Sequence, residues 1–244
     1  MNDQQTLEKL RALRLTGMAD GFEAYLRLGA ADKRTPSQLL AELADAECDT
    51  RENRRNERLL NKARLRFQAT FEELSFTPER NLDRAMVGKL AQTEWIRGGA
   101  TVLITGATGA GKSFLACAIG RHTCLSGIPT HYEQATKFFP RLKQCRGDGT
   151  FRHEIDRLAK TPVLILDDFG LLPLDSEDRI ALLEILEDRY ARSATVIVSQ
   201  LPVGNWHAAI GEPTVADAIM DRLAHTPFIF ELKGGSQRKT RKYE

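Results

Sequence analysis

Two short stretches of the sequence have residue types suited to binding and cleaving a nucleoside triphosphate. The first, GATGAGKS, satisfies the pattern G-x-x-x-x-G-K-[ST] between an apolar strand-like run and a helix-like run. Glycines let successive backbone N–H groups turn towards a polyphosphate, and the start of the helix adds partial positive charge. A plain glycine-rich turn would leave the lysine unexplained. The residues expected to contact the nucleotide are Gly106, Ala107, Thr108, Gly109, Ala110, Gly111, Lys112, Ser113 and Phe114.

Within this loop, Lys112 should reach the β- and γ-phosphates, and the Ser113 hydroxyl should ligate Mg²⁺. The second stretch, PVLILDDFG, places Asp167 and Asp168 directly after four apolar residues. A buried strand of this kind delivers its carboxylates to the crevice where parallel sheets bind ligands. We expect Asp167 to hold Mg²⁺, directly or through water, and Asp168 to orient and deprotonate the attacking water. An isolated Asp-Asp pair would also suit a helix cap or a turn.

A third apolar run, ATVIVSQLP, ends in Ser199 and Gln200. These polar side chains should reach the same edge of the sheet, where one of them would touch the γ-phosphate or the water. Taken alone, a polar residue at the end of a strand is usually just a loop residue. The expectation therefore depends on the two preceding motifs.

The elements that must position these motifs alternate between strands and helices from residue 100 to residue 244. Such alternation indicates an α/β fold with a parallel sheet flanked by helices. The expected strands are 101–105, 130–133, 163–166, 195–199 and 228–232, and the two main helices are 112–124 and 175–192.

Residues 1–67 read instead as a small all-α domain. A capping box formed by Thr35 and Gln38 should start a helix that runs to about Cys48, and a further helix should begin near Thr50. Residues 68–99 show a weaker pattern, with one helix expected at about 81–92 and no strand. We interpret this segment as a linker.

The helix beginning near Thr50 is strongly basic and is opposed by only two glutamates, Glu52 and Glu57. A run of this kind suits a nucleic-acid backbone, although a solvated helix face is an equally good interpretation. The candidate DNA contacts in this helix are Arg51, Arg54, Arg55, Arg58, Lys62 and Arg64.

Composition sets broad limits on these interpretations. The 244 residues carry a net charge of only +2, so net charge says little about partners. The N-terminus lacks the apolar core of a signal peptide, and no apolar run approaches the length of a membrane span. The four cysteines show no metal-ligand or disulfide spacing. We expect a cytoplasmic protein with no membrane partner.

The motifs above, together with NWHAAIGEPTVADAIMDRLAHTPFIFELKGGSQRK, LRLTGMADGFEAYL and RENRRNERLLNKARL, resemble the IstB family of AAA+ ATPases. These are helper proteins of certain bacterial insertion sequences, related more distantly to DnaC-type helicase loaders. The resemblance implies an AAA+ P-loop NTPase that uses ATP and Mg²⁺ and forms a homo-oligomer on double-stranded DNA. It also implies a transposase partner, which the protein helps to reach or act on target sites.

The same resemblance suggests roles for residues that composition alone would not single out. Gln200 matches the family's first sensor position, and Arg222 in MDRLAH matches an arginine finger that completes a neighbouring subunit's site. Ser236 and Arg238 occupy the place of a C-terminal signature, where Gly235 departs from an expected acidic residue.

Residues 134–153 fall where initiator and loader ATPases insert an extra helix that contacts DNA. Lys137, Arg141 and Lys143 are the candidate phosphate contacts there, while the phenylalanines should pack and Pro140 should kink or break the helix.

Two alternatives remain open from the sequence. A helicase loader would share the ATPase core but use the N-terminal domain to bind a helicase. A P-loop kinase or small NTPase acting on a metabolite would need a lid and an acceptor pocket, for which the chain has no evident room.

Overall fold

The computed structural model describes residues 2–28, 34–224 and 227–237, and the chain divides into two compact units, 1–58 and 59–244. Unit 1 contains α1 (Asp3–Ala12), α2 (Thr16–Leu28) and most of α3 (Pro36–Ala63). Unit 2 contains the end of α3 and all of the strands.

Helix α3 begins at the capping box expected from the sequence. The Gln38 amide donates to the Thr35 hydroxyl at 3.3 Å, and the Thr35 amide donates to the Gln38 side chain at 2.8 Å. The helix then runs without interruption to Ala63, which corrects the break expected between Cys48 and Thr50. No glycine or proline follows Pro36 within it, and an ion pair between Glu47 and Arg51 spans the expected break.

Within unit 1, the buried carboxylate of Glu47 ties α3 to the start of α2. It accepts the backbone N–H groups of Gly17 at 2.8 Å and Met18 at 3.2 Å, which have no partner inside α2. The hydrogen bond from Arg51 is the main cause that lowers the pKa of Glu47. A carboxylate thus caps a helix that has no acidic residue in its own first turn.

Unit 2 is built on a five-stranded parallel sheet in the order β2-β3-β4-β1-β5. The strands are β1 (Thr101–Gly106), β2 (Thr130–Gln134), β3 (Val163–Phe169), β4 (Ala194–Ser199) and β5 (Phe228–Leu232). All five expected strands are present, with ends that differ by a few residues at most. The α/β fold predicted from the alternating pattern is confirmed.

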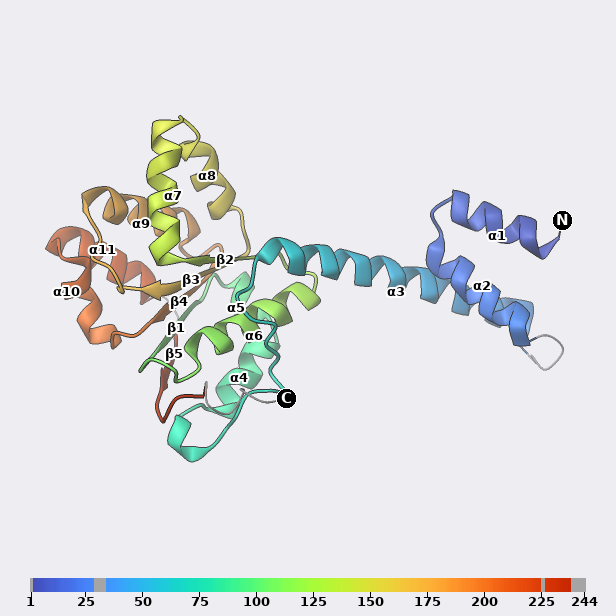
Figure 1. The fold of residues 1–244 in the computed structure, drawn as a ribbon, viewed down its shortest axis with the longest axis horizontal. Coiled ribbons are helices and arrows are strands. Elements are labelled where there is room, and N and C mark those ends of the chain that lie inside the picture. The colour runs from blue at the N-terminus through green and yellow to red at the C-terminus, as the bar shows by residue number, and fades with distance from the viewer. Residues whose placement is uncertain (1, 29–33, 225–226, 238–244) are drawn as a thin grey trace. The chain divides into compact units, whose positions relative to one another are not determined.

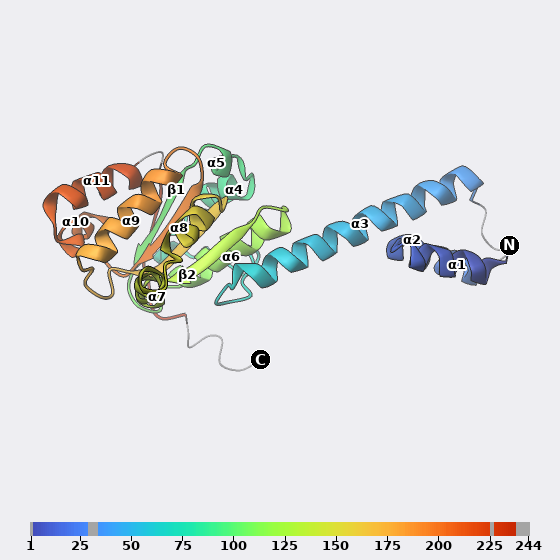
Figure 2. The same ribbon diagram turned by 90° about the horizontal axis from the view of Figure 1, so that it is seen from above.

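Helices cover both faces of this sheet (Figures 1 and 2). Val102 and Ile104 of β1 face one core, whereas Leu103 between them faces the other. The first core is closed by α4 (Arg84–Ala91), α5 (Glu94–Arg97) and α6 (Lys112–Leu125). The second is closed by α7 (Ala135–Gly147), α8 (Phe151–Ala159), α9 (Ser176–Arg189), α10 (Trp206–Ile210) and α11 (Pro213–Leu223). Short 3₁₀ helices lie at η2 (Pro78–Arg80) and η3 (Val203–Asn205).

Residues 68–99 belong to the first core of unit 2. Ala69, Leu74, Leu90 and Trp95 are buried with residues of α6 and the sheet. These apolar side chains come from turns and from two short helices, so the segment shows no clear periodicity, yet each of them is almost completely buried. Residues 68–99, which the sequence leads us to expect as a linker, therefore pack within unit 2, and the two compact units divide between Arg58 and Leu59.

Helix α7 continues through Pro140, so of the kink or break expected there, the break does not occur. In the described residues, no helix combines the length and the apolar character that crossing a membrane requires.

Candidate nucleotide-binding site

The loop between β1 and α6 has a backbone that only glycine adopts easily. Gly109 and Gly111 have φ values of +87° and +91°. A Cβ atom at Gly109 would lie 2.6 Å from the Ser236 hydroxyl, and one at Gly111 would lie 2.5 Å from the Arg80 guanidinium. Because these two glycines have no side chain, Ser236 and Arg80 can approach the loop closely, and both glycines also line the cavity.

Side chains of the loop are held by short internal hydrogen bonds. Lys112, 7% exposed, donates from Nζ to the Ala107 carbonyl at 2.9 Å. The Thr108 hydroxyl donates to Oε1 of Gln200 at 2.8 Å, which joins the loop to the end of β4. Loop and strand end, which lie far apart in the sequence, thus form one polar edge.

The two aspartates at the end of β3 have different surroundings. Asp167 is fully buried, where it accepts the Tyr132 hydroxyl at 2.5 Å and the Asp168 amide at 2.8 Å. Burial, followed by the charge of Asp167, raises the pKa of Tyr132. Asp168 lines the cavity described below and is reached by the side chains of Arg66 and Gln134. Asp167 therefore lies behind the site, whereas Asp168 lies within it.

A local irregularity of β3 turns Asp168 into the site. Its φ is +58°, unusual for a residue other than glycine, and the pairing of β3 with β4 shifts register between Leu166 and Phe169. A residue held in this conformation carries strain of about 1 kcal/mol or more, which the surrounding structure must offset. Such strain often accompanies a functional position.

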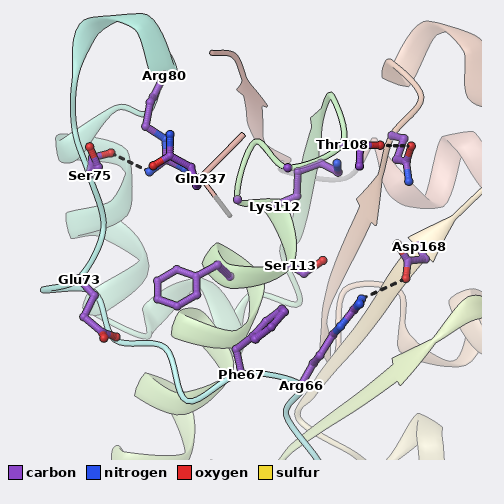
Figure 3. Close-up of a pocket in the computed structure, with 14 residues that line it drawn as sticks. Arg66, Phe67, Glu73, Ser75, Arg80, Thr108, Lys112, Ser113, Asp168 and Gln237 are labelled. Carbon is purple, nitrogen blue, oxygen red and sulfur yellow. Dashed lines mark hydrogen bonds and ion pairs between the residues drawn. The ribbon is translucent and has the colours of Figure 1, made fainter. Parts of the chain in front are cut away.

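The loop and Asp168 border one cavity of about 480 Å³. Its cationic side chains are Arg66, Arg80 and Lys112, and its carboxylates are Glu73 and Asp168, so the balance favours an anionic ligand (Figure 3). The remaining lining residues are Phe67, Ser75, Thr108, Gly109, Gly111, Ser113, Phe114, Gln200 and Gln237.

Several of these lining residues were missed by the sequence analysis because they come from the segment read as a linker and from its borders. Arg80 is nearly buried and donates to the carbonyls of Ala110 at 2.8 Å and Ser75 at 3.2 Å. Phe67 lies 6.4 Å from Phe114, ring centre to ring centre. Nothing in their local sequence marks them as ligand-facing. The basic run before Phe67 was the one available signal for Arg66.

The C-terminal stretch also reaches the loop. The Gln237 amide donates to the Gly109 carbonyl at 3.0 Å, and Ser236 is the neighbour that a side chain at Gly109 would strike. Arg238, the other residue of the expected signature, lies outside the described residues.

Four other predicted residues do not line this cavity. Ser199 is buried and donates to the Phe169 carbonyl at 2.7 Å. Gly106, Ala107 and Ala110 shape the loop through their backbone, and Ala107 and Ala110 offer their carbonyls to Lys112 and Arg80.

Arg222, near the end of α11, also lies outside the cavity. Its guanidinium donates to Glu187 at 2.7 Å and to Asp221 at 2.5 Å, and it stands over the Tyr190 ring at 5.1 Å. Within one copy of the chain, this arginine therefore does not reach the loop.

The predicted DNA contacts fall into two groups. On α3, Arg54, Arg58 and Lys62 have no carboxylate within ion-pair distance among the described residues, whereas Arg51 pairs with Glu47.

On α7, Arg141 bridges Glu133 and Glu154, and Lys143 pairs with Asp175 at 2.5 Å. Lys137 is exposed, and Arg64 follows the last residue of α3.

The sequence matches a family model and a relative over nearly its whole length. The model of the IstB-like ATP binding protein family matches residues 8–244. The chain belongs to this family. An insertion sequence ATP-binding protein of Sinorhizobium fredii is 41% identical to this family member over 237 residues, which cover 97% of each chain.

Solved structures support the fold. DnaI superposes on this IstB-like chain with a TM-score of 0.58 and 21% identity, over 75% of this chain and 93% of DnaI. The DnaC helicase loader does so with a TM-score of 0.57 and 19% identity, over 72% of this chain and 99% of DnaC. The fold is therefore that of the AAA+ P-loop NTPases, as the resemblance implied.

Proposed function

We propose that this IstB-like protein binds and hydrolyses ATP, and that it uses the reaction as a DNA-bound oligomer to assist the transposase of its insertion sequence. The observation that carries the ATPase part is the cavity itself, in which the glycine loop, Lys112 and the strained Asp168 face one another. The insertion sequence relatives favour a transposition role over helicase loading.

The triphosphate would lie along the loop. Backbone N–H groups around Gly109 and Gly111 and the ammonium of Lys112 would offset its charge, with Lys112 exchanging the Ala107 carbonyl for phosphate oxygens. The base would occupy the other part of the cavity. Its apolar wall there is formed by Phe67 and Phe114, and its polar groups come from Glu73 and Ser75.

Hydrolysis requires a water aligned with the γ-phosphorus. Asp168 would accept a proton from that water as its oxygen bonds to phosphorus and the bond to the ADP oxygen breaks. Gln200, which the Thr108 hydroxyl holds at the same edge, would orient the water or the γ-phosphate. The strained backbone of Asp168 keeps its carboxylate in the cavity before the substrate arrives.

The residues present fit a magnesium ion. The hydroxyl of Ser113 lines the cavity, and the carboxylate of Asp167 lies behind Asp168 with oxygens that can each accept a further hydrogen bond from a metal-bound water. Bound there with the triphosphate, Mg²⁺ would neutralise charge that develops between the β- and γ-phosphates.

Assembly and DNA binding complete the proposal. Arg222 lies away from the cavity of its own chain, so a role as an arginine finger requires the site of a neighbouring copy. The exposed cations of α3 supply a surface for the DNA backbone.

Two substitutions test the site. Lys112→Ala should weaken binding of a fluorescent ATP analogue by about a hundredfold or more, because it removes the charge on the triphosphate. Asp168→Asn should leave that affinity within about threefold but lower kcat by about a hundredfold. Lys89→Ala, on the exposed face of α4, is the matched control. Equal loss of affinity in both site variants would contradict the assigned roles.

The same assay tests assembly. Neither Arg222→Ala nor Asp168→Asn should turn over ATP well alone, but a mixture should regain part of the activity if Arg222 acts across an interface. Duplex DNA should raise the wild-type rate. A rate that ignores both DNA and protein concentration would instead indicate an ATPase that works as a monomer.

A further inference from the structure

The carboxylate of Asp168 is engaged by a cation that belongs to neither motif. Nη1 of Arg66 lies 3.4 Å from Oδ2 of Asp168 (Figure 3). Nε2 of Gln134 lies 3.3 Å from the same oxygen. The Arg66 side chain is 38% exposed and that of Asp168 is 21% exposed. A pair that is this long and this accessible to water is weak and easily opened.

The end of α3 delivers this guanidinium to the cavity. Arg64, with φ of +56°, ends the helix, and Leu65 then packs against Gly120 of α6. Phe67, the next residue, lies 6.4 Å from Phe114 of α6, ring centre to ring centre. The residues on both sides of Arg66 therefore contact the helix of the phosphate loop, whereas its partly exposed side chain remains able to change partners.

Arg66 also stands beside the basic end of α3. Lys62 and Arg64 precede it by four and two residues, and both are exposed. A phosphodiester bound by these two cations would lie within reach of a third. An arginine in this place has two competing anionic partners, the Asp168 carboxylate on one side and a DNA phosphate on the other, and it binds phosphate with good geometry.

We propose that Arg66 is a positioning residue that couples DNA binding at α3 to ATP hydrolysis by exchanging Asp168 for a DNA phosphate. The inference rests on the proposed function of the site. Without DNA, Arg66 holds Oδ2 of Asp168 and competes with the water that this carboxylate must orient. With DNA on the end of α3, the guanidinium turns to a phosphate and Asp168 is released for catalysis.

The test is steady-state ATP hydrolysis by full-length Arg66→Gln, with and without random duplex DNA. The DNA-free kcat should rise about two- to fivefold, the range to which an ion pair of this exposure converts. KM and the affinity for a fluorescent ATP analogue should stay unchanged, because Arg66 is not a phosphate ligand in this scheme. Stimulation by DNA should fall towards onefold.

Two further variants separate coupling from a merely structural role. Arg66→Lys keeps the charge, so it should restore most of the low DNA-free rate and part of the stimulation. Arg97→Gln removes an exposed arginine at the end of α5 and controls for the loss of one positive charge. Higher salt should raise the DNA-free rate of the wild type but not that of Arg66→Gln, since salt weakens the exposed pair.

The possible failures are distinguishable. If Arg66→Gln keeps the wild-type rate and stimulation, or loses rate at unchanged affinity, the coupling role is overturned while the ATPase stands. If it loses nucleotide affinity, Arg66 is a phosphate ligand instead. If the wild type hydrolyses ATP but ignores DNA, the coupling fails and so does the DNA-dependent part of the proposed function. A wild type without ATPase activity overturns both.

Discussion

Helices α3 and α7 both carry a run of cations, but these cations have different neighbours. On α7, Arg141 lies between Glu133 and Glu154, and Lys143 pairs with Asp175. On α3, the cations recur every three or four residues from position 51 to position 62, which places them on one face of the helix. Arg54, Arg58 and Lys62 have no ion-pair partner in the part of the chain that the structure describes, whereas Arg51 pairs with Glu47.

The difference arises from packing. The basic side of α7 faces the end of β2 and the acidic residues of α8, so its arginine belongs to an internal network. The network extends through Arg157, which donates to Glu154 at 2.7 Å and lies 3.2 Å from His131. Spacing in a sequence thus shows which cations share a face, but neighbouring carboxylates decide whether they are available to DNA.

The largest expected effect follows from the α3 side of this comparison. Replacing Arg54, Arg58 and Lys62 together by alanine should weaken duplex binding by about a hundredfold at 0.1 M salt, because three phosphate contacts and their counterions are lost. The slope of log affinity against log salt should become shallower by about two to three. Fluorescence anisotropy with a labelled random duplex, measured across a salt series, provides both values.

The matched variant on α7 is Lys143→Ala. Because Asp175 and Asp178 already hold this ammonium, its loss should change DNA affinity less than about twofold. If Lys143→Ala weakens binding as much as the α3 triple variant, the two helices do not differ in the way proposed.

The same contrast explains what the sequence could predict. The phosphate loop and the two aspartates of β3 lie in contiguous motifs, where local backbone needs fix the residue types. The strands followed from their apolar runs. These features depend on neighbours within a few positions, so one sequence suffices to predict them.

Other features depend on tertiary contacts between distant segments. Arg80 and Ser75 reach the cavity only because residues 68–99 pack against α6, and Arg66 meets Asp168 across 102 positions of sequence. Periodicity gives no sign of such contacts. The break assigned near Cys48 failed for a different reason, since a change of residue character was read as an end where no helix-breaking residue stands.

A smaller effect is expected when the α7 network itself is cut. Arg141→Met leaves Glu133 and Glu154, which are nearly buried, without a cation that both of them bind. We expect the free energy of unfolding to fall by about 1–3 kcal/mol, measured from urea denaturation at pH 7. Lys137→Met, on the exposed side of the same helix, should cost less than about 0.5 kcal/mol. Equal costs would show that the Arg141 bridges contribute nothing beyond helix packing.

The smallest effect is a pH dependence of this network. The hydrogen bond from Arg157 is the main cause that lowers the pKa of Glu154 from 4.5 to about 2, with Arg141 adding to it and burial opposing it. A carboxyl with a lowered pKa stabilises the fold above its unfolded-state pKa and loses that contribution as pH falls through the folded-state value. The loss should therefore occur between about pH 4.5 and pH 2.

Arg157→Gln reveals this contribution, because the variant lacks the main cause of the lowered pKa. It should be less stable than the wild type by about 1–2 kcal/mol at pH 7, and the difference should shrink towards zero near pH 2, where Glu154 becomes protonated in both proteins. Urea midpoints measured from pH 7 down to pH 2 give this difference directly. A difference that stays constant over the whole range would mean that Arg157 stabilises α8 by packing, and that the carboxylates around α7 are not what keeps its cations from DNA.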